Sequence, residues 1–134
     1  MKKVLILMAT YNGAKYLDEQ IQSLIEQKNV QVDILVRDDG STDNTIEVLN
    51  KWKEQNKLEW YKGKHLNVQF GFYDLMERAR TRDVDYLAFC DQDDVWDLDK
   101  LCIAVEKLEK LCNKSMPALY YCGQRLVDEN MKFI

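Results

Sequence analysis

The sequence has little proline, glycine or histidine and contains no long apolar run. One proline, five glycines and one histidine occur among 134 residues, which excludes collagen-like and low-complexity chains. A membrane-spanning helix needs about 20 consecutive apolar residues, so we expect no transmembrane segment. The formal net charge is -4 and basic residues do not cluster, which argues against nucleic acid as a partner. With 46% hydrophobic residues, the chain is long enough for one compact globular unit.

The four cysteines follow the pattern of neither a zinc site nor a disulfide framework. They are Cys90, Cys102, Cys112 and Cys122, without a CxxC pair or a neighbouring histidine cluster. We expect reduced, packed thiols in a cytosolic protein. A disulfide framework is the weaker alternative, because a chain of this length can build a core without cross-links.

Short apolar strands alternate with amphipathic helices. The runs Val4–Ala9 and Ile34–Val36 are typical of strands buried on both faces of a parallel sheet. The first run is too short for a signal peptide and ends in turn-forming residues. Apolar residues at helical spacing predict a helix over residues 14–27, which completes a βαβ unit.

The alternation continues toward the end of the chain. Asn44 and Glu47 resemble a capping box that begins a second helix. Further helices are predicted at 72–79 and 101–111, strands at 58–61, 86–90 and 118–122, and a hairpin from 125–127 and 132–134. The predicted fold class is therefore α/β, a mostly parallel sheet flanked by helices.

Three polar segments directly follow predicted strands, at residues 10–13, 38–41 and 91–94. The carboxyl ends of parallel strands meet at one edge of a sheet, where ligands of open α/β proteins bind. Five carboxylates gathered there would repel one another, and a bound cation would relieve the repulsion. Oxygen ligands without Cys or His favour Mg²⁺ or Mn²⁺, ions that also bind substrate phosphates. The sequence thus predicts a metal-dependent site for a phosphorylated ligand, most simply a nucleotide.

Some polar residues near these segments have a simpler interpretation as turn or helix-start residues, namely Asp94, Asp97, Asp99, Ser41 and Thr42. Asp91 and Asp93 are instead assigned to ligand binding. They follow a strand directly, and a second acidic turn follows a neighbouring strand.

The segments Ala9–Gly13, Arg37–Asp43 and Cys90–Trp96 match, in order and spacing, a known family. They resemble the N-terminal half of GT-A glycosyltransferases of the family-2 type. The run Asp-Gln-Asp-Asp-Val-Trp is similar to that of rhamnosyltransferase-like members, which build bacterial capsule, lipopolysaccharide or other cell-wall polysaccharide. The resemblance implies that residues 1–134 are the nucleotide-diphospho-sugar-binding part of a GT-A, Rossmann-like domain, truncated at its C-terminal side.

The resemblance also implies roles for five residues. Ala9 and Tyr11 would bind the nucleotide-diphosphate sugar donor, with the Tyr11 ring packing against a pyrimidine. Asp39 would accept a hydrogen bond from the ring N–H. Asp91 would approach the ribose or the sugar, and Asp93, the last acid of the Asp-x-Asp (DXD) element, would ligate Mg²⁺ or Mn²⁺.

Transfer with inversion to a saccharide or lipid-linked acceptor is the implied reaction, in the cytoplasm or peripherally at the inner face of the membrane. It requires a carboxylate as general base, and the catalytic base is not found in this chain. The only late acidic pair, Asp128 and Glu129, is better interpreted as a hairpin turn.

Several other residues near the expected ligand receive no role. His65, Lys64, Arg78, Arg80 and Arg82 are interpreted as incidental or solvated side chains. Family members commonly have a glycine two residues after the asparagine matched by Asn67. Here that position is Gln69, and Gly71 is displaced.

Two alternatives to a complete transferase stay open. One is a non-catalytic nucleotide-sugar-binding module that lacks the acceptor half. The other is an unrelated Mg²⁺-dependent α/β phosphatase or nucleotidyltransferase, whose acids also lie at strand ends. Because a truncated α/β domain exposes apolar surface, we expect a homo-oligomer.

Overall fold

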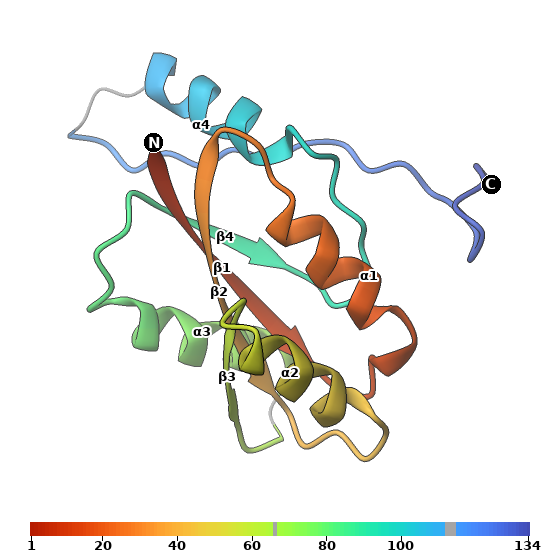
Figure 1. Ribbon diagram of the computed structural model, residues 1–134. Coiled ribbons are helices and arrows are strands. Elements are labelled where there is room, and N and C mark those ends of the chain that lie inside the picture. Colours follow the sequence, from red (N-terminus) through yellow and green to blue (C-terminus); the bar gives the residue numbers. More distant parts are fainter. Residues whose placement is uncertain (66, 112–114) are drawn as a thin grey trace. The chain divides into compact units, whose positions relative to one another are not determined.

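The computed structural model describes residues 1–65, 67–111 and 115–134 (Figure 1). It divides the chain into two compact units, Met1–Cys102 and Ile103–Ile134, where the sequence predicts one. None of the described residues of the second unit is buried. The expected core therefore lies in the first unit.

A parallel sheet forms the centre of the first unit (Figure 1). Its strands are β1 (Lys2–Thr10), β2 (Val30–Asp38), β3 (Glu59–Lys62) and β4 (Tyr86–Cys90). The order in the sheet is β3-β2-β1-β4, and every neighbouring pair is parallel. Parallel neighbours need long crossover connections, which helices provide here. The predicted α/β class and mostly parallel sheet are confirmed.

Four helices connect or follow these strands: α1 (Ala14–Ile25), α2 (Thr45–Glu54), α3 (Val68–Ala79) and α4 (Lys100–Leu111). Helices α1 and α2 lie side by side (Figure 1), whereas α3 packs on β1 and β2. Helix α4 begins in the first unit and ends in the second. All four helices lie where the apolar spacing predicts them.

Strand β1 is buried on both faces. One core cluster joins its residues Leu5 and Leu7 to Leu35 of β2 and to Leu75 and Ala79 of α3. The intervening residues of β1, Val4, Ile6 and Met8, are equally buried and point to the other face, because side chains alternate along a strand. This double coverage explains why the strand is an uninterrupted apolar run.

The predicted strand at 118–122 is wrong. Residues 118–122 form no ladder, and Leu119 and Tyr121 are 80% and 87% exposed. An apolar segment becomes a strand only when a neighbouring strand satisfies its backbone. The predicted hairpin is reduced to a single antiparallel bridge between Val127 and Phe133. Its turn is present, since Asp128 Oδ1 accepts hydrogen bonds from the backbone of Asn130 and Lys132.

The capping box at Asn44 is also wrong, because this side chain makes no cap hydrogen bond. Asp43, one residue earlier, accepts from the backbone N–H and hydroxyl of Thr45 at 2.9 and 2.6 Å instead. Cys90, Cys102 and Cys122 are free thiols, and Cys112 lies outside the described residues. Cys90 is buried, but Cys122 is exposed, so the expectation of packed thiols is wrong for Cys122. Within the described ranges, no helix has the length and hydropathy needed to cross a bilayer.

Candidate functional site

Hydrogen bonds join the polar segments that follow β1, β2 and β4. The backbone N–H of Asn12 donates to Ser41 Oγ at 2.9 Å, and the Asn12 side chain accepts from Thr42 N at 2.8 Å. Tyr11 and Gln92 are joined through the backbone of one and the side chain of the other. The prediction that these three turns meet at one edge of the sheet is confirmed.

Asp38 shapes the turn after β2 from within. It is fully buried; its Oδ1 accepts from the Thr10 hydroxyl at 3.1 Å, and its Oδ2 accepts from the N–H groups of Gly40 and Ser41 at 2.9 Å. Gly40 has φ +91°, a conformation that side chains disfavour. Because the turn itself uses both oxygens of Asp38, the expectation that all five acids converge on one ligand is corrected.

Asp39 belongs to the same turn and is largely buried. The residue is 8% exposed, and its backbone N–H donates a hydrogen bond to the Thr10 carbonyl at 2.8 Å. Its carboxylate forms an ion pair with the guanidinium of Arg37, the last residue but one of β2. A carboxylate keeps further acceptor positions after one such pairing. Asp39 is therefore a negatively charged, oriented acceptor.

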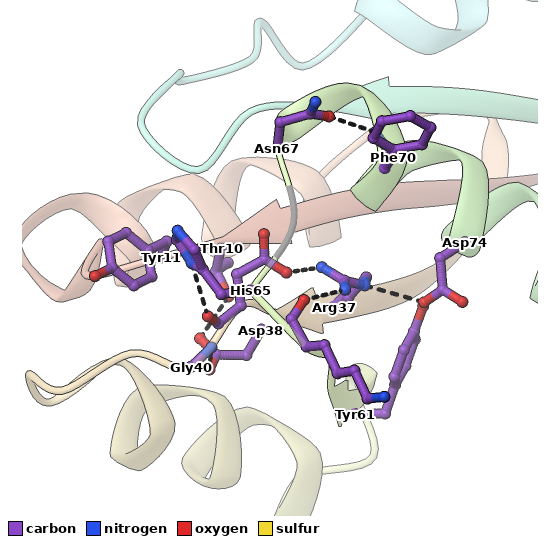
Figure 2. A network of polar contacts seen from close by, with 12 residues as sticks. Thr10, Tyr11, Arg37, Asp38, Gly40, Tyr61, His65, Asn67, Phe70 and Asp74 are labelled. Atoms are coloured by element: carbon purple, nitrogen blue, oxygen red, sulfur yellow. Dashed lines mark hydrogen bonds and ion pairs between the residues drawn. The ribbon is translucent and has the colours of Figure 1, made fainter.

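Arg37 is a functional candidate that the sequence did not reveal. Its side chain is 1% exposed, and its Nε and Nη2 donate to Asp74 Oδ2 at 3.0 Å and to the Lys64 carbonyl at 2.6 Å. The Tyr61 hydroxyl donates to the same Asp74 oxygen at 2.7 Å. Figure 2 shows Arg37 between Asp74 and Tyr61 on one side and the Thr10–Tyr11 turn on the other.

The charges around Arg37 stabilise one another. The hydrogen bond from Tyr61 and then that from Arg37 hold the pKa of the Asp74 carboxyl below its usual range. Partial burial, followed by the bond to Asp74, raises the pKa of the Tyr61 hydroxyl. The guanidinium of Arg78 stacks on the Tyr61 ring, 3.8 Å from its centroid. A buried guanidinium is tolerable only with partners of this kind.

Gly63 leaves space that the Arg37 guanidinium fills. A Cβ atom on Gly63 would lie 2.3 Å from Arg37 Cζ, whereas one on Gly71 would make an ordinary contact, 3.4 Å from Nη1. Gly71 is the displaced glycine noticed in the sequence. Asn67, which precedes it, caps α3 by accepting from the Phe70 N–H at 3.0 Å (Figure 2). Gly63 is therefore the sequence feature that accompanies the buried arginine.

Tyr11 presents an aromatic face at the end of β1. It is 46% exposed, and its ring centroid lies 5.0 Å from that of His65. His65 Nδ1 lies 3.3 Å from the Asp39 carbonyl oxygen, so this histidine is near both Tyr11 and Asp39 (Figure 2). Ala9, the other proposed donor-binding residue of this strand end, lies in β1 beside Arg37 and packs against the core cluster. Nothing in the sequence pattern separates His65 from an incidental loop histidine.

The loop after β4 carries three neighbouring carboxylates, Asp91, Asp93 and Asp94. The pKa of the Asp91 carboxyl is raised, first by its partial burial and then by the charges of Asp94 and Asp93. No group of three or more potential ligands preformed for a metal is found among the described residues. Neighbouring carboxylates repel one another, and a hard cation bound between them would relieve that repulsion. Such a cation could take its remaining ligands from a diphosphate instead of from further protein side chains.

Gln92 fixes this loop to the turn after β1. Its Oε1 accepts from the Tyr11 N–H at 2.9 Å, and its Nε2 donates to the Tyr11 carbonyl at 3.1 Å. A Cβ atom on Gly13 would lie 2.2 Å from Gln92 Oε1. The glycine therefore makes room for the amide, which occupies the variable position between Asp91 and Asp93.

Polar residues of α1 and of the turn just after it hold the continuation of the loop. Ser23 Oγ accepts from the Trp96 N–H at 3.1 Å. The Gln27 amide donates to the Asp97 carbonyl at 2.7 Å and accepts from Leu101 N at 3.0 Å. One turn earlier on α1, buried Gln20 contacts the Cys90 thiol, whose pKa is raised by burial. Buried polar residues at helical spacing are the signal that could have identified this support.

The fold and these turns define an α/β protein with an acidic, aromatic-lined edge. The family model for glycosyl transferase family 2 matches residues 5–131. The chain therefore belongs to this family, which confirms the resemblance drawn from its motifs.

Known proteins resemble the chain over most of its length. The dTDP-rhamnosyl transferase RfbG of Shigella flexneri is 36% identical over 137 residues, which cover 91% of this chain and 45% of RfbG. S. aureus TarS 1-349 in complex with UDP has TM-score 0.62 and 26% identity, covering 82% of this chain and 32% of that one. The mannosyltransferase PcManGT from Pyrobaculum calidifontis, in complex with GDP-Man and Mn²⁺, has TM-score 0.68 and 24% identity, covering 80% and 32%.

These likenesses identify the sheet and its helices as a GT-A fold. The chain spans less than half the length of each of these proteins.

Proposed function

We propose that the chain forms the donor-binding part of an inverting, metal-dependent glycosyltransferase. It would take a sugar from a nucleotide-diphosphate donor, dTDP-rhamnose or a UDP-sugar, for transfer to a saccharide acceptor in bacterial polysaccharide biosynthesis. The observation that carries the proposal is the joining of three turns at one edge, with Tyr11, Asp39 and the Asp91–Asp93 loop on them. The rhamnosyl transferase relative and the UDP complex of TarS support the class of donor.

Each proposed donor contact follows from the chemistry of its residue. The half-exposed Tyr11 ring would stack on the pyrimidine, and Ala9 would lie beneath the nucleoside near the strand end. The Asp39 carboxylate would accept a hydrogen bond from the pyrimidine N–H. A charged acceptor that is only 8% exposed discriminates strongly, because a base without that donor would leave it unpaired.

The Asp91–Asp93 loop would bind the diphosphate end of the donor through Mg²⁺ or Mn²⁺. Asp93 would ligate the ion, and Asp91 would contact the ribose or sugar. A divalent cation there supplies positive charge that stabilises a departing nucleoside diphosphate. The mannosyltransferase with the same fold is described in complex with Mn²⁺, which supports the use of a divalent metal by this chain.

The acceptor half of the reaction is assigned to the rest of a longer transferase. Asp128, the late acid considered for the general base, uses its Oδ1 in the turn before Lys132. This favours the second candidate function for the isolated chain, a module that binds the nucleotide sugar without transferring it. The expected acceptor is a saccharide, free or lipid-linked, in the cytoplasm or at the inner face of the membrane.

We also propose that the chain associates with copies of itself. Among the described strands, β4 pairs with β1 alone, and Leu87 and Phe89 of β4 are 44% and 47% exposed. A strand edge beside exposed apolar side chains is a common site of association.

Calorimetric titration of the full chain with UDP, dTDP and GDP, with and without Mn²⁺, tests the donor proposal. We expect a pyrimidine nucleotide to bind more tightly with Mn²⁺, and Asp93→Asn to abolish that metal-dependent gain. Asp99→Asn, which changes an acid outside the proposed site, serves as the matched control. Absence of pyrimidine binding with any metal would refute the assignment. Binding without sugar transfer or donor hydrolysis would identify the non-catalytic module, and cleavage at phosphorus would indicate a phosphatase or nucleotidyltransferase.

A further inference from the structure

The Arg37 side chain links three parts of the chain beneath the proposed base-binding residues. It pairs with the Asp39 carboxylate of its own strand end, with Asp74 of α3 and with the Lys64 carbonyl of the β3–α3 connection. These three partners use the Nη1, Nε and Nη2 nitrogens respectively. The planar guanidinium therefore has one partner on each nitrogen, an arrangement that a lysine cannot reproduce.

The Asp74 side of this arrangement is itself supported. Asp74 Oδ2 accepts from both Arg37 Nε and the Tyr61 hydroxyl, and Arg78 lies 3.9 Å from the same oxygen. Tyr61 belongs to β3 and Asp74 to α3, so the anchor rests on regular elements. A rigid anchor restricts the rotamers of the guanidinium and, through it, those of the paired carboxylate.

We propose that Arg37 is the positioning residue for recognition of the nucleotide base. It would hold the Asp39 carboxylate in one orientation, so that a free acceptor position of Asp39 meets the pyrimidine N–H without reorganisation on binding. Asp74 would act one step further away by fixing Arg37. This inference rests on the proposed function of Asp39, but it concerns Arg37 and Asp74, to which the resemblance assigns no role.

The same guanidinium links Asp39 to the loop that adjoins the Tyr11 ring. It donates a hydrogen bond to the carbonyl of Lys64, the residue before His65. The His65 ring contacts that of Tyr11, and its Nδ1 lies near the Asp39 carbonyl. Loss of the guanidinium would therefore free both the Asp39 carboxylate and the Lys64–His65 segment from their present positions. Base selectivity is therefore expected to fall along with affinity.

A double-mutant cycle with UDP and CDP tests the proposal, because cytosine has no N–H at the ring position where uracil has one. In the full chain, Asp39→Asn should reduce the preference for UDP over CDP. Arg37→Lys should lower the affinity for UDP by about tenfold, the usual scale for a charge-assisted contact, and should lower the affinity for CDP less. In the Asp39→Asn background, Arg37→Lys should have no further effect on the preference.

Arg80→Lys provides the matched control. Arg80 is an exposed arginine just after α3 that pairs with Glu77 of that helix, and its replacement should change neither nucleotide affinity nor preference. The proposal is overturned if Arg37→Lys leaves the preference intact, or if it weakens UDP and CDP equally in both backgrounds, as a merely structural role would.

If circular dichroism shows that Arg37→Lys does not fold, Asp74→Asn takes its place in the cycle. The Asp74 side chain is 39% exposed, so its replacement is the milder change. We expect about a threefold loss of UDP affinity in the parent chain, since a single bond to the guanidinium is weakened, and no loss in the Asp39→Asn background. An unchanged preference would overturn the proposal. Failure of the parent chain to bind any pyrimidine nucleotide would instead refute the proposed function itself.

Discussion

The side-chain amide of Gln92 forms two hydrogen bonds with the backbone of Tyr11, accepting from its N–H at 2.9 Å and donating to its carbonyl at 3.1 Å. An amide side chain thus pairs with β1 just beyond its end, much as a neighbouring strand would. Asp91 and Asp93 flank Gln92 on either side. The proposed metal-binding loop and the proposed base-stacking residue are therefore held in one arrangement.

Replacement of Gln92 should loosen that arrangement while the fold persists. Gln92→Ala removes both bonds, and we expect Mn²⁺-dependent UDP affinity to fall about tenfold, which corresponds to one or two lost hydrogen bonds. Calorimetry with and without Mn²⁺ measures the effect. Gln69→Ala is the matched control, because its exposed amide donates to Tyr73 on the surface of α3. An equal effect of the two substitutions would contradict a positioning role for Gln92.

A substitution at Gly13 should act through the same amide. The new Cβ atom of Gly13→Ala would lie 2.2 Å from Gln92 Oε1, so the amide must leave its place beside Tyr11. We expect a loss of Mn²⁺-dependent UDP affinity similar to that of Gln92→Ala, and a loss of unfolding free energy of about 1 kcal/mol. Combining the two substitutions should add little further loss of affinity. Fully additive effects in calorimetry would show that Gly13 acts by another route.

A substitution at Gly63 should destabilise the protein strongly. A Cβ atom there would lie 2.3 Å from Arg37 Cζ, and the buried guanidinium cannot move without leaving its carboxylate partners. We expect Gly63→Ala to lower the unfolding free energy by about 2–3 kcal/mol, the scale of overpacking in a closed site. Urea denaturation followed by circular dichroism measures this loss.

Gly123→Ala is the control for that measurement, because among the described residues no atom beyond its two chain neighbours lies within 4 Å of the position its Cβ would occupy. Its unfolding free energy should stay within about 0.5 kcal/mol of the parent. A Gly63→Ala protein as stable as this control would mean that Arg37 has room to relax.

Self-association should depend on the exposed apolar residues of β4. Leu87→Lys places a charge at the strand edge, and we expect sedimentation velocity at several concentrations to show a shift from oligomer to monomer. Tyr16→Lys is the control, since Tyr16 is a partly exposed residue of α1, 38% accessible. A parent chain that sediments as a strict monomer at every concentration would contradict the proposed oligomer.

The sequence predicted those parts of the fold that follow from local periodicity. The alternating apolar runs identified all four strands of the sheet, and parallel pairing then required their polar ends to meet. The Ala118–Cys122 run, equally apolar, is not a strand in the structure. Periodicity describes what a segment can bury, but it does not reveal whether a partner strand is present.

The supporting contacts of the site could not be predicted in the same way. Arg37 and Asp74 are 37 residues apart, and an arginine next to two aspartates is usually a solvated surface residue. Its burial depends on Gly63, whose missing side chain leaves space for the guanidinium only once β3 and the segment after it are in place. Likewise, Gln92 occupies the variable position of the Asp-x-Asp element, and only the geometry of Gly13 shows its role.

The last expectation concerns the dependence of stability on pH through Asp43. This carboxylate joins the starts of two helices, because it accepts from the Thr45 N–H and hydroxyl and from the Ala14 N–H at 3.1 Å. The hydrogen bonds from Thr45 hold its pKa below the ordinary value of 3.8. A lowered pKa in the folded state means that the stabilisation is complete above about pH 3.8 and is lost as the pH falls through the lowered value.

Asp43→Ala should therefore lower the unfolding free energy by about 1 kcal/mol at pH 7, as loss of a helix cap does. The difference from the parent should shrink as the pH falls below about 3.8, because the parent then loses the charged form that its partners stabilise. Asp43→Asn keeps one acceptor oxygen and does not titrate, so its stability relative to Asp43→Ala should not depend on pH. Urea denaturation at pH 7, 4 and 3 provides the measurement, and a constant gap between the parent and Asp43→Ala would show that the carboxylate charge contributes nothing to joining α1 and α2.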